Sequence, residues 1–222
     1  MIMPLGDDNS DRATTPFVNY ALIVVNVFVF VLLQGMGSNE KFTYAFSTVP
    51  QEITTGVDID KTVKLVDKDS GEILGAIDLQ PTPISVYITL LTSMFMHGGF
   101  AHLGGNMLYL WIFGDNVEDR LGHARYLLFY LIVGVLASLA HVFSTIAFDG
   151  NPYIPSLGAS GAISGVLGGY LLLFPRKRVR VLMLNMLTEV PSIVAIGLWF
   201  VFQIVSSLGS ARGQAGGVAY GA

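Results

Sequence analysis

A few polar side chains in otherwise apolar segments are the residues that could carry chemistry. His102 and Asn106 are four positions apart, so both project from one face of a helix. Ser160 stands in the sequence GASG, residues 158–161, where a loop gives way to an apolar run. The chain has no cysteine, which excludes a thiolate nucleophile, a disulfide framework and a cysteine zinc site. Any reaction must therefore use hydroxyl, imidazole or carboxylate groups.

The composition indicates that these groups lie in a membrane. Only 13% of the 222 residues are charged, against about 25% in soluble domains. The charges are also clumped and leave five charge-free stretches, residues 13–39, 79–114, 126–148, 150–175 and 190–211. Each is long enough to cross a hydrocarbon core, which takes about 20 helical residues. The apolar content and the net charge of −4 exclude a collagen, a disordered tail and a nucleic-acid binder.

The apolar segments predict an all-α polytopic membrane protein. We expect five spanning helices, at residues 17–34, 100–114, 126–148, 160–174 and 191–208, and the start of a sixth at Gly216. Residues 86–96 are expected to lie at the interface, and residues 115–125 to form a charged connector. Gly161, Gly165 and Gly169 recur every four residues and predict a face where another helix approaches closely.

The segment between the first two apolar regions is polar. Residues 36–84 hold twelve charged side chains, and their pattern predicts a small β-hairpin that turns at Asp69-Ser70-Gly71. We interpret this segment as an extramembrane insertion. The domain organisation is then a cytoplasmic lead at residues 1–16, followed by a membrane domain at 17–222 that contains the insertion 36–84.

The distribution of Lys and Arg predicts the orientation of the chain. Four of the five residues at 176–180 are basic, and the connector at residues 115–125 contains Arg120 and Arg125, whereas the loop before Ser160 has no basic residue. Short loops rich in Lys and Arg stay in the cytoplasm. The N-terminus is therefore expected inside, the insertion outside, and Ser160 near the outer face at a depth similar to that of His102. An ionisable group inside a membrane is costly and is a candidate for function.

Longer motifs around these residues carry a resemblance. The run HGGFAHLGGN at residues 97–106, the GASG stretch and the spacing of the apolar segments resemble the rhomboid family of intramembrane serine proteases. The opening MIMPLGDDN and FTYAFSTVPQEI at residues 42–53 are similar to a bacterial subgroup of that family. The resemblance implies that Ser160 is the nucleophile, and that His102, Asn106 and the Ser160 backbone N–H donate hydrogen bonds to the oxyanion. It also implies substrates that are membrane proteins with a single transmembrane helix, and a bacterial cytoplasmic membrane as the location.

Two departures from the family pattern stand out. Many members carry Trp-Arg in the first outer loop, where this chain has Ile88-Thr89. The family base is a histidine in the sixth span, within a GGVAYxAH-like stretch, whereas residues 216–222 read GGVAYGA and end there. We therefore expect a chain truncated before its base, and we expect the 222 residues alone to be inactive in peptide hydrolysis.

The four histidines of the chain are poor substitutes for that base. His123 is predicted to be cytoplasmic, His97 and His102 belong to the second-span cluster, and His141 lies past the middle of the third span. His97 and His141 are evenly balanced between a structural hydrogen bond and a supporting role. We interpret Ser164 as a packing residue.

Structural roles for the same residues are alternatives to the catalytic interpretation. Ser160 alone would be a small packing residue, and His102 with Asn106 could be a polar clamp between two helices. At the level of the whole protein, the alternative is a non-catalytic rhomboid-like protein that binds transmembrane helices. A transporter or channel lacks support, because no paired charges or matched repeats occur across the spans. No metal or organic cofactor is implied, and the partners are membrane-protein substrates and the lipid bilayer, not nucleic acid.

Overall fold

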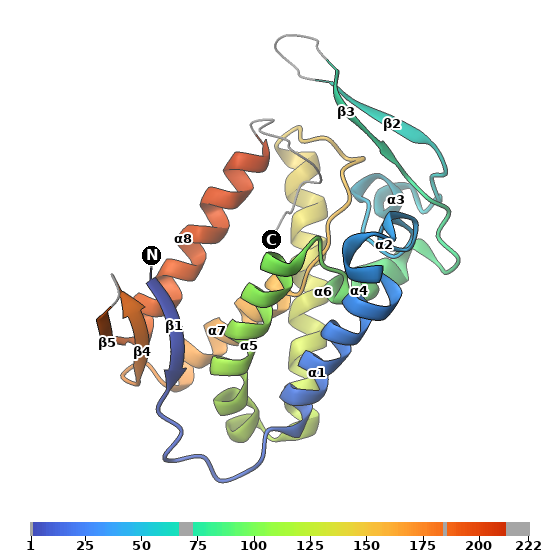
Figure 1. Cartoon of the computed structure of the whole chain (residues 1–222). Coiled ribbons are helices and arrows are strands. Elements are labelled where there is room, and N and C mark those ends of the chain that lie inside the picture. Colours follow the sequence, from blue (N-terminus) through green and yellow to red (C-terminus); the bar gives the residue numbers. More distant parts are fainter. Residues whose placement is uncertain (1, 67–72, 184–185, 212–222) are drawn as a thin grey trace.

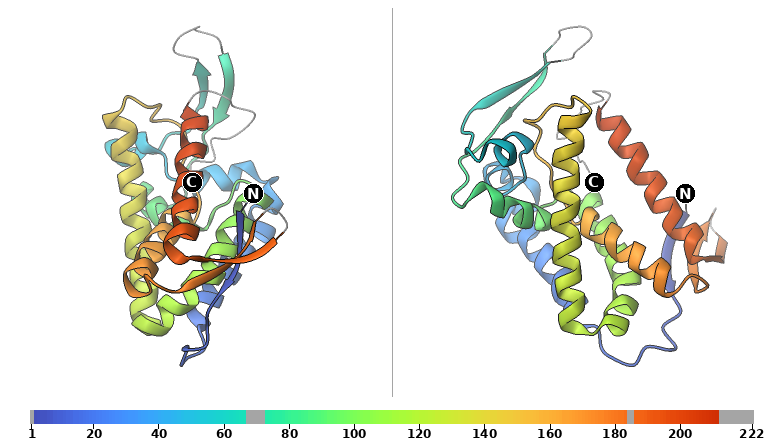
Figure 2. Two further views of the ribbon diagram at one scale, coloured as in Figure 1. Left: turned by 90° about the vertical axis from the view of Figure 1, so that its left-hand side faces the viewer. Right: turned by 180° about the vertical axis from the view of Figure 1, so that it is seen from behind.

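Long helices form the body of the molecule in the computed structural model, which describes residues 2–66, 73–183 and 186–211 (Figure 1). In chain order they are α1 (Phe17–Phe28), α5 (Phe100–Leu121), α6 (His123–Ala147), α7 (Ser160–Leu173) and α8 (Ser192–Ala211). A π-helical segment, Val29–Leu33, continues α1. The views from two sides show α7 in the middle of the bundle, where it packs against α5 and α6 (Figure 2).

Close packing of α7 depends on its glycines. A Cβ added at Gly161 would lie 2.6 Å from Ala137 Cβ, and one at Gly165 would lie 2.6 Å from Val133 Cγ2, both on α6. Such approaches are closer than van der Waals contact, so no larger residue fits without displacing α6. At Gly169 the added Cβ would make an ordinary contact with Phe129 at 3.5 Å. The predicted small-residue face is confirmed at Gly161 and Gly165.

The predicted insertion, residues 36–84, folds at one end of this bundle, where its Ile53 shares an apolar cluster with Val142 of α6. The helical turn η2 (Gly35–Gly37) leads into it, and it contains α2 (Glu40–Ala45), α3 (Pro50–Thr55) and the antiparallel strands β2 (Thr62–Val66) and β3 (Ile73–Asp78). The strands project away from the helices (Figure 1). The predicted hairpin is confirmed in its strands, while its predicted turn at 69–71 lies outside the described residues. The short helices η3 (Val86–Ile88), α4 (Thr89–Thr92) and η4 (Ser93–Phe95) then lead to α5.

A second sheet corrects the all-α prediction. Strands β1 (Ile2–Asp7), β4 (Arg178–Met183) and β5 (Met186–Pro191) form an antiparallel sheet in the order β1-β4-β5. Buried and exposed side chains alternate along β4, which explains why it forms a strand: Val179 and Val181 are completely buried, whereas Arg178 and Arg180 are exposed. Period-2 alternation is the signature of a half-buried strand. The first residues of the chain therefore form a strand, which the description of 1–16 as a lead missed.

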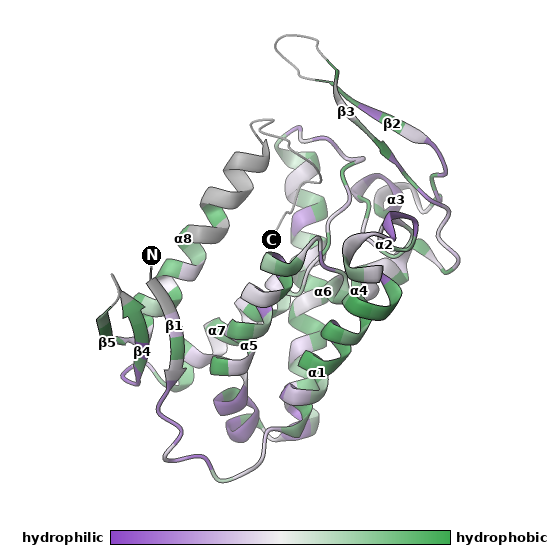
Figure 3. Cartoon of the chain, viewed as in Figure 1, coloured by the Kyte–Doolittle hydropathy of each residue, from purple (hydrophilic) through white to green (hydrophobic). Residues whose placement is uncertain are grey.

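The end of α5 is a second correction. The segment predicted as a charged connector is helical through Leu121, and the chain turns only at Gly122, whose φ is +79°. Its acidic side chains have partners in the N-terminal segment. Glu118 accepts hydrogen bonds from the backbone N–H groups of Val18 and Asn19 at 3.0 and 2.6 Å, and Asp119 accepts one from Thr14 N at 2.7 Å. The hydrophilic end of α5 stands out in Figure 3.

One helix among the described residues, His123–Ala147, is both long enough and apolar enough to cross a membrane by itself. Shorter apolar helical stretches occupy Phe17–Leu33, Val86–Phe95, Ser160–Leu173 and Ser192–Val201. These stretches fall where the first, fourth and fifth spans and the interfacial segment were predicted. The predicted start of the sixth at Gly216 lies outside the described residues.

Candidate active site

The start of α5 and the start of α7 bring the predicted residues to one place. Gly158, two residues before Ser160, has a φ of +122°, a conformation that L side chains rarely adopt. A Cβ added to it would lie 2.8 Å from His102 Cε1 and Nε2 and 3.8 Å from Asn106 Nδ2. The imidazole and the amide therefore face the backbone that enters α7. We call His97, His102, Asn106, Gly158 and Ser160 the Gly158 cluster.

The Asn106 amide is a buried donor for which the described residues provide no acceptor. The residue is 2% exposed, and its Nδ2 makes no hydrogen bond with any part of the chain that the structure describes. Leaving a buried polar group unpaired costs about 1–3 kcal/mol, so such groups call for an explanation. An acceptor that arrives only during a reaction would remove this cost.

Ser160 is placed where a developing negative charge is stabilised. It is the first residue of α7 and is 4% exposed. The first N–H groups of a helix have no intrahelical acceptor, and the helix dipole favours negative charge at this end. Among the described residues, Ser160 Oγ donates no hydrogen bond that would hold it away from a substrate. The arrangement suits a nucleophile beside a group of N–H donors.

A glutamine that sequence reasoning missed fixes the backbone beside this cluster. Gln34 is completely buried, and its amide forms two hydrogen bonds of 2.9 Å with the main chain of His97, one from His97 N and one to His97 O. The His97 ring is also completely buried, and its centroid lies 5.2 Å from that of His102. Gln34 ends the first apolar segment, and its polar amide in that position was the available signal.

The other predicted polar residues have separate places. His123 is the first residue of α6, next to the end of α5; its Nδ1 is 2.5 Å from Glu118 Oε1 and its ring centroid is 3.8 Å from that of Phe17. His141 lies on α6. Ser164 Oγ accepts a hydrogen bond from Trp199 Nε1 at 3.3 Å, which ties α7 to α8.

A second polar cluster occupies the opposite ends of the same two helices. Asp7 Oδ2 accepts hydrogen bonds from Tyr170 Oη at 2.6 Å and from Asn116 Nδ2 at 2.7 Å. Asn116 Nδ2 also lies 2.6 Å from Asn9 Oδ1, and Asn116 Oδ1 accepts from Lys177 Nζ at 2.9 Å. Burial raises the pKa of Asp7 to about 6, although the Tyr170 hydrogen bond opposes the shift. We call these five residues the Asp7 cluster.

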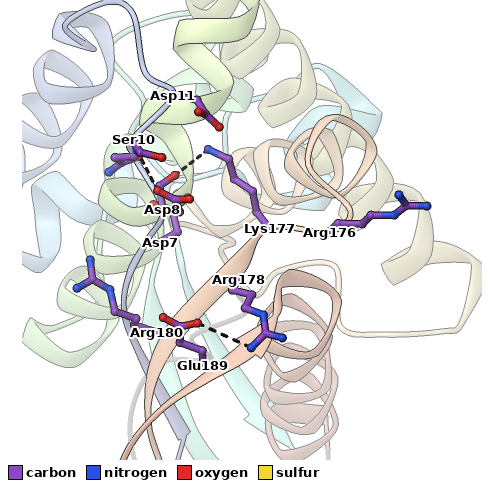
Figure 4. Close-up of a pocket in the computed structure, with 10 residues that line it drawn as sticks. Asp7, Asp8, Ser10, Asp11, Arg176, Lys177, Arg178, Arg180 and Glu189 are labelled. Carbon is purple, nitrogen blue, oxygen red and sulfur yellow. Dashed lines mark hydrogen bonds and ion pairs between the residues drawn. The ribbon is translucent and has the colours of Figure 1, made fainter.

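An open cleft of about 770 Å³ adjoins the Asp7 cluster (Figure 4). Basic side chains make two polar contacts there: Lys177 Nζ donates a hydrogen bond to the Asp8 backbone carbonyl at 2.7 Å, and Arg178 Nη1 lies 3.9 Å from the Glu189 carboxylate. Its four acidic and four basic side chains balance in charge. No group of three or more His, Cys, Asp or Glu side chains within the described ranges could hold a metal ion.

Comparisons with known proteins point to one family. The family model of the rhomboid domain matches residues 85–222, a range that includes His102, Asn106 and Ser160. The chain is 39% identical over 131 residues to rhomboid protease GluP of Bacillus subtilis, covering 58% of this chain and 24% of that protein. It is 37% identical over 105 residues to the mitochondrial rhomboid protein 1 of Saccharomyces cerevisiae, covering 46% and 29%. It is 36% identical over 84 residues to the putative rhomboid protease YdcA of Bacillus subtilis, covering 38% and 40%.

The chain thus spans about a quarter of the length of the first two of these relatives. No solved structure matches it.

Proposed function

This chain belongs to the rhomboid family, and on that premise we propose that it is an intramembrane serine protease. Members of the family are helical integral membrane proteins, and the described residues are mostly helical. The proposal includes five spanning helices and the beginning of a sixth, a cytoplasmic N-terminus, Ser160 toward the outer face, and a place in a bacterial cytoplasmic membrane. The substrates are membrane proteins with a single transmembrane helix, cleaved within or beside that helix.

Ser160 is the proposed nucleophile. Its Oγ forms a bond to the carbonyl carbon of the scissile peptide, and its proton passes to a base and then to the leaving amine. His102, Asn106 and the Ser160 backbone N–H are the proposed donors to the oxyanion. The observation that carries this assignment is the buried Asn106 Nδ2 beside Gly158, which has no hydrogen-bond partner among the described residues. An acceptor at that point gains a hydrogen bond that those residues do not supply.

We assign the general base to a histidine that follows residues 216–222, because the family has its sixth-span histidine in that position. Water then hydrolyses the acyl-enzyme with the same histidine as base. No cofactor or metal ion takes part in this scheme.

Cleavage in a bilayer tests the proposal. The full-length gene product is placed in proteoliposomes with a fluorescent single-helix substrate that carries Gly and Ala near the outer end of its helix. We expect a cleavage product with wild-type protein and none with Ser160→Ala. If the wild-type protein binds the substrate helix and leaves it intact, the protease proposal is wrong, and the alternative of a non-catalytic protein that binds transmembrane helices takes its place.

A further inference from the structure

The loop that leads into Ser160 is hydrogen-bonded to the insertion, a segment to which the proposed function gives no role. Thr48 and Ser156 form an isolated antiparallel bridge, with Ser156 N donating to Thr48 O at 2.8 Å and Thr48 N donating to Ser156 O at 3.0 Å. Gln51 N donates to Pro152 O at 2.9 Å in the same loop. Two backbone segments a hundred residues apart are therefore held in register four residues before the nucleophile.

The Thr48 side chain extends this connection to Gly158. Thr48 is completely buried, and its Oγ1 lies 2.9 Å from both Thr89 O and Ser93 Oγ. A hydroxyl both donates and accepts, so one threonine can satisfy both contacts. Ser93 O in turn accepts a hydrogen bond from Gly158 N at 2.9 Å. Thr48 thus contacts Ser156 directly and Gly158 through Ser93.

Apolar packing holds the same loop from the side of the hairpin. Tyr153 and Ile154 pack against a buried cluster of the insertion made of Tyr44, Val49, Ile77 and Leu79. Lys61 Nζ lies 4.8 Å above the centre of the Tyr153 ring. The insertion therefore holds the loop directly by backbone hydrogen bonds and side-chain packing, and indirectly by the buried Thr48 hydroxyl, which is connected to Gly158 through Ser93.

We infer that Thr48 is a positioning residue, through which the insertion sets the place of Gly158 and Ser160 relative to His102 and Asn106. The expected effect on catalysis rests on the proposed function, but the contacts between the insertion and the loop before Ser160 do not depend on it. A misplacement of about 1 Å can cost about 10²-fold in rate. Loss of the Thr48 hydroxyl should act on the chemical step and leave substrate binding unchanged.

Thr48→Val tests the inference in the full-length protein, because valine keeps the shape and the backbone bonds but lacks the hydroxyl. We expect kcat to fall about 10- to 100-fold with KM unchanged, and Thr48→Ser to restore it. Ser47→Ala is the matched control: Ser47 is also completely buried, but within the described residues its hydroxyl bonds only to Thr43 O, four residues back, at 2.6 Å. If Thr48→Val keeps the wild-type kcat, or if Ser47→Ala lowers it equally, Thr48 does not position the nucleophile.

Amide hydrogen exchange tests the contacts between the insertion and the loop before Ser160 without any need for activity. Peptides that cover residues 149–159 should exchange faster in Thr48→Val than in wild type, and at the wild-type rate in Thr48→Ser. Ser93→Ala removes the same side-chain contact from the other side and takes its place if Thr48→Val does not fold. An unchanged exchange rate overturns the inference, whereas an inactive wild-type protein with faster exchange in the variant overturns only the proposed function.

Discussion

The Gly158 cluster and the Asp7 cluster lie at opposite ends of α5 and α7, and two asparagines of α5 show how they differ. Asn106 and Asn116 are 2% and 3% exposed. Asn116 uses both of its amide atoms, in contacts with Asp7, Asn9 and Lys177. Asn106 Nδ2 makes none with the described residues. Equal burial with unequal hydrogen bonding is the difference that the proposed function predicts between a polar group that stabilises the fold and one that binds a substrate.

The same contrast holds between two hydroxyl groups of α7. Tyr170 Oη, near the end of the helix, donates to Asp7 at 2.6 Å, and it thereby joins α7 to β1. Ser160 Oγ, at the start, donates no such bond to the residues that the structure describes. The Asp7 cluster connects three elements that no local sequence pattern brings together, whereas the Gly158 cluster leaves its donors facing one backbone position.

Replacing Asn106 should give the largest difference between the two clusters. Loss of one oxyanion donor costs about 10²–10³ in kcat, so Asn106→Ala should cleave the reporter helix that much more slowly. Its thermal stability should be equal to that of wild type or slightly higher, because the variant removes a buried group that has no hydrogen-bond partner among the described residues. A variant that loses stability and keeps its kcat would assign Asn106 to the fold.

Asn116→Ala is the matched change in the Asp7 cluster. It leaves the buried Asp7 carboxylate and Lys177 with one partner fewer, so the free energy of unfolding should fall by about 1–3 kcal/mol. Cleavage per folded molecule should stay at the wild-type value. Denaturant titration in detergent, with activity measured on the folded fraction, checks both. A drop in kcat as large as that of Asn106→Ala would remove the distinction between the clusters.

Tyr170→Phe should have a smaller effect of the same kind. It removes one hydrogen bond to Asp7 and keeps the ring, which is completely buried and packs at 5.0 Å from Phe113. The expected loss is about 0.5–1.5 kcal/mol in the free energy of unfolding, measured as a lower denaturation midpoint with an unchanged slope. A neutral substitution would mean that this bond does not hold β1 to α7.

The pH dependence of stability tests the Asp7 cluster in a different way. Burial raises the pKa of Asp7 from 3.8 to about 6, with nearby Asp115 adding to the shift and Tyr170 and Lys177 opposing it. The folded protein then binds this proton more tightly than the unfolded chain, so the contribution of Asp7 to stability is complete below about pH 4 and is lost as the pH rises through about 6. Asp7→Asn should remove this part of the pH profile, and an identical profile in the variant would contradict the raised pKa.

Much of the architecture could be predicted from the sequence because it follows from local patterns. Apolar runs indicated the long helices, and the four-residue spacing of His102 and Asn106 placed both on one helix face. Alternation in the hairpin region indicated β2 and β3. Apolar and charged residues also alternate in β4, but its arginines were interpreted as a signal of membrane topology, so the strand was not predicted. The helical end of α5 was missed because the partners of Glu118 and Asp119 lie about a hundred residues earlier.

Long-range backbone contacts account for what the sequence could not predict in the site. The bridge between Thr48 and Ser156 uses main-chain atoms that every residue has, so no residue type announces it. The buried amide of Gln34 was visible as a polar residue, but its partner, the His97 backbone, was not. The identities of Ser160, His102 and Asn106 could be proposed in advance, whereas the position of Gly158 between α5 and α7 required the fold.

Covalent labelling by a fluorophosphonate probe, with the modified residue located by mass spectrometry, tests the central claim most directly. The full-length protein should carry the adduct on Ser160, and Ser160→Ala should carry none. Ser164→Ala is the matched control, because Ser164 lies one turn further along α7 and bonds to Trp199; this variant should label like wild type. An adduct on another residue, or labelling that persists in Ser160→Ala, would contradict the account.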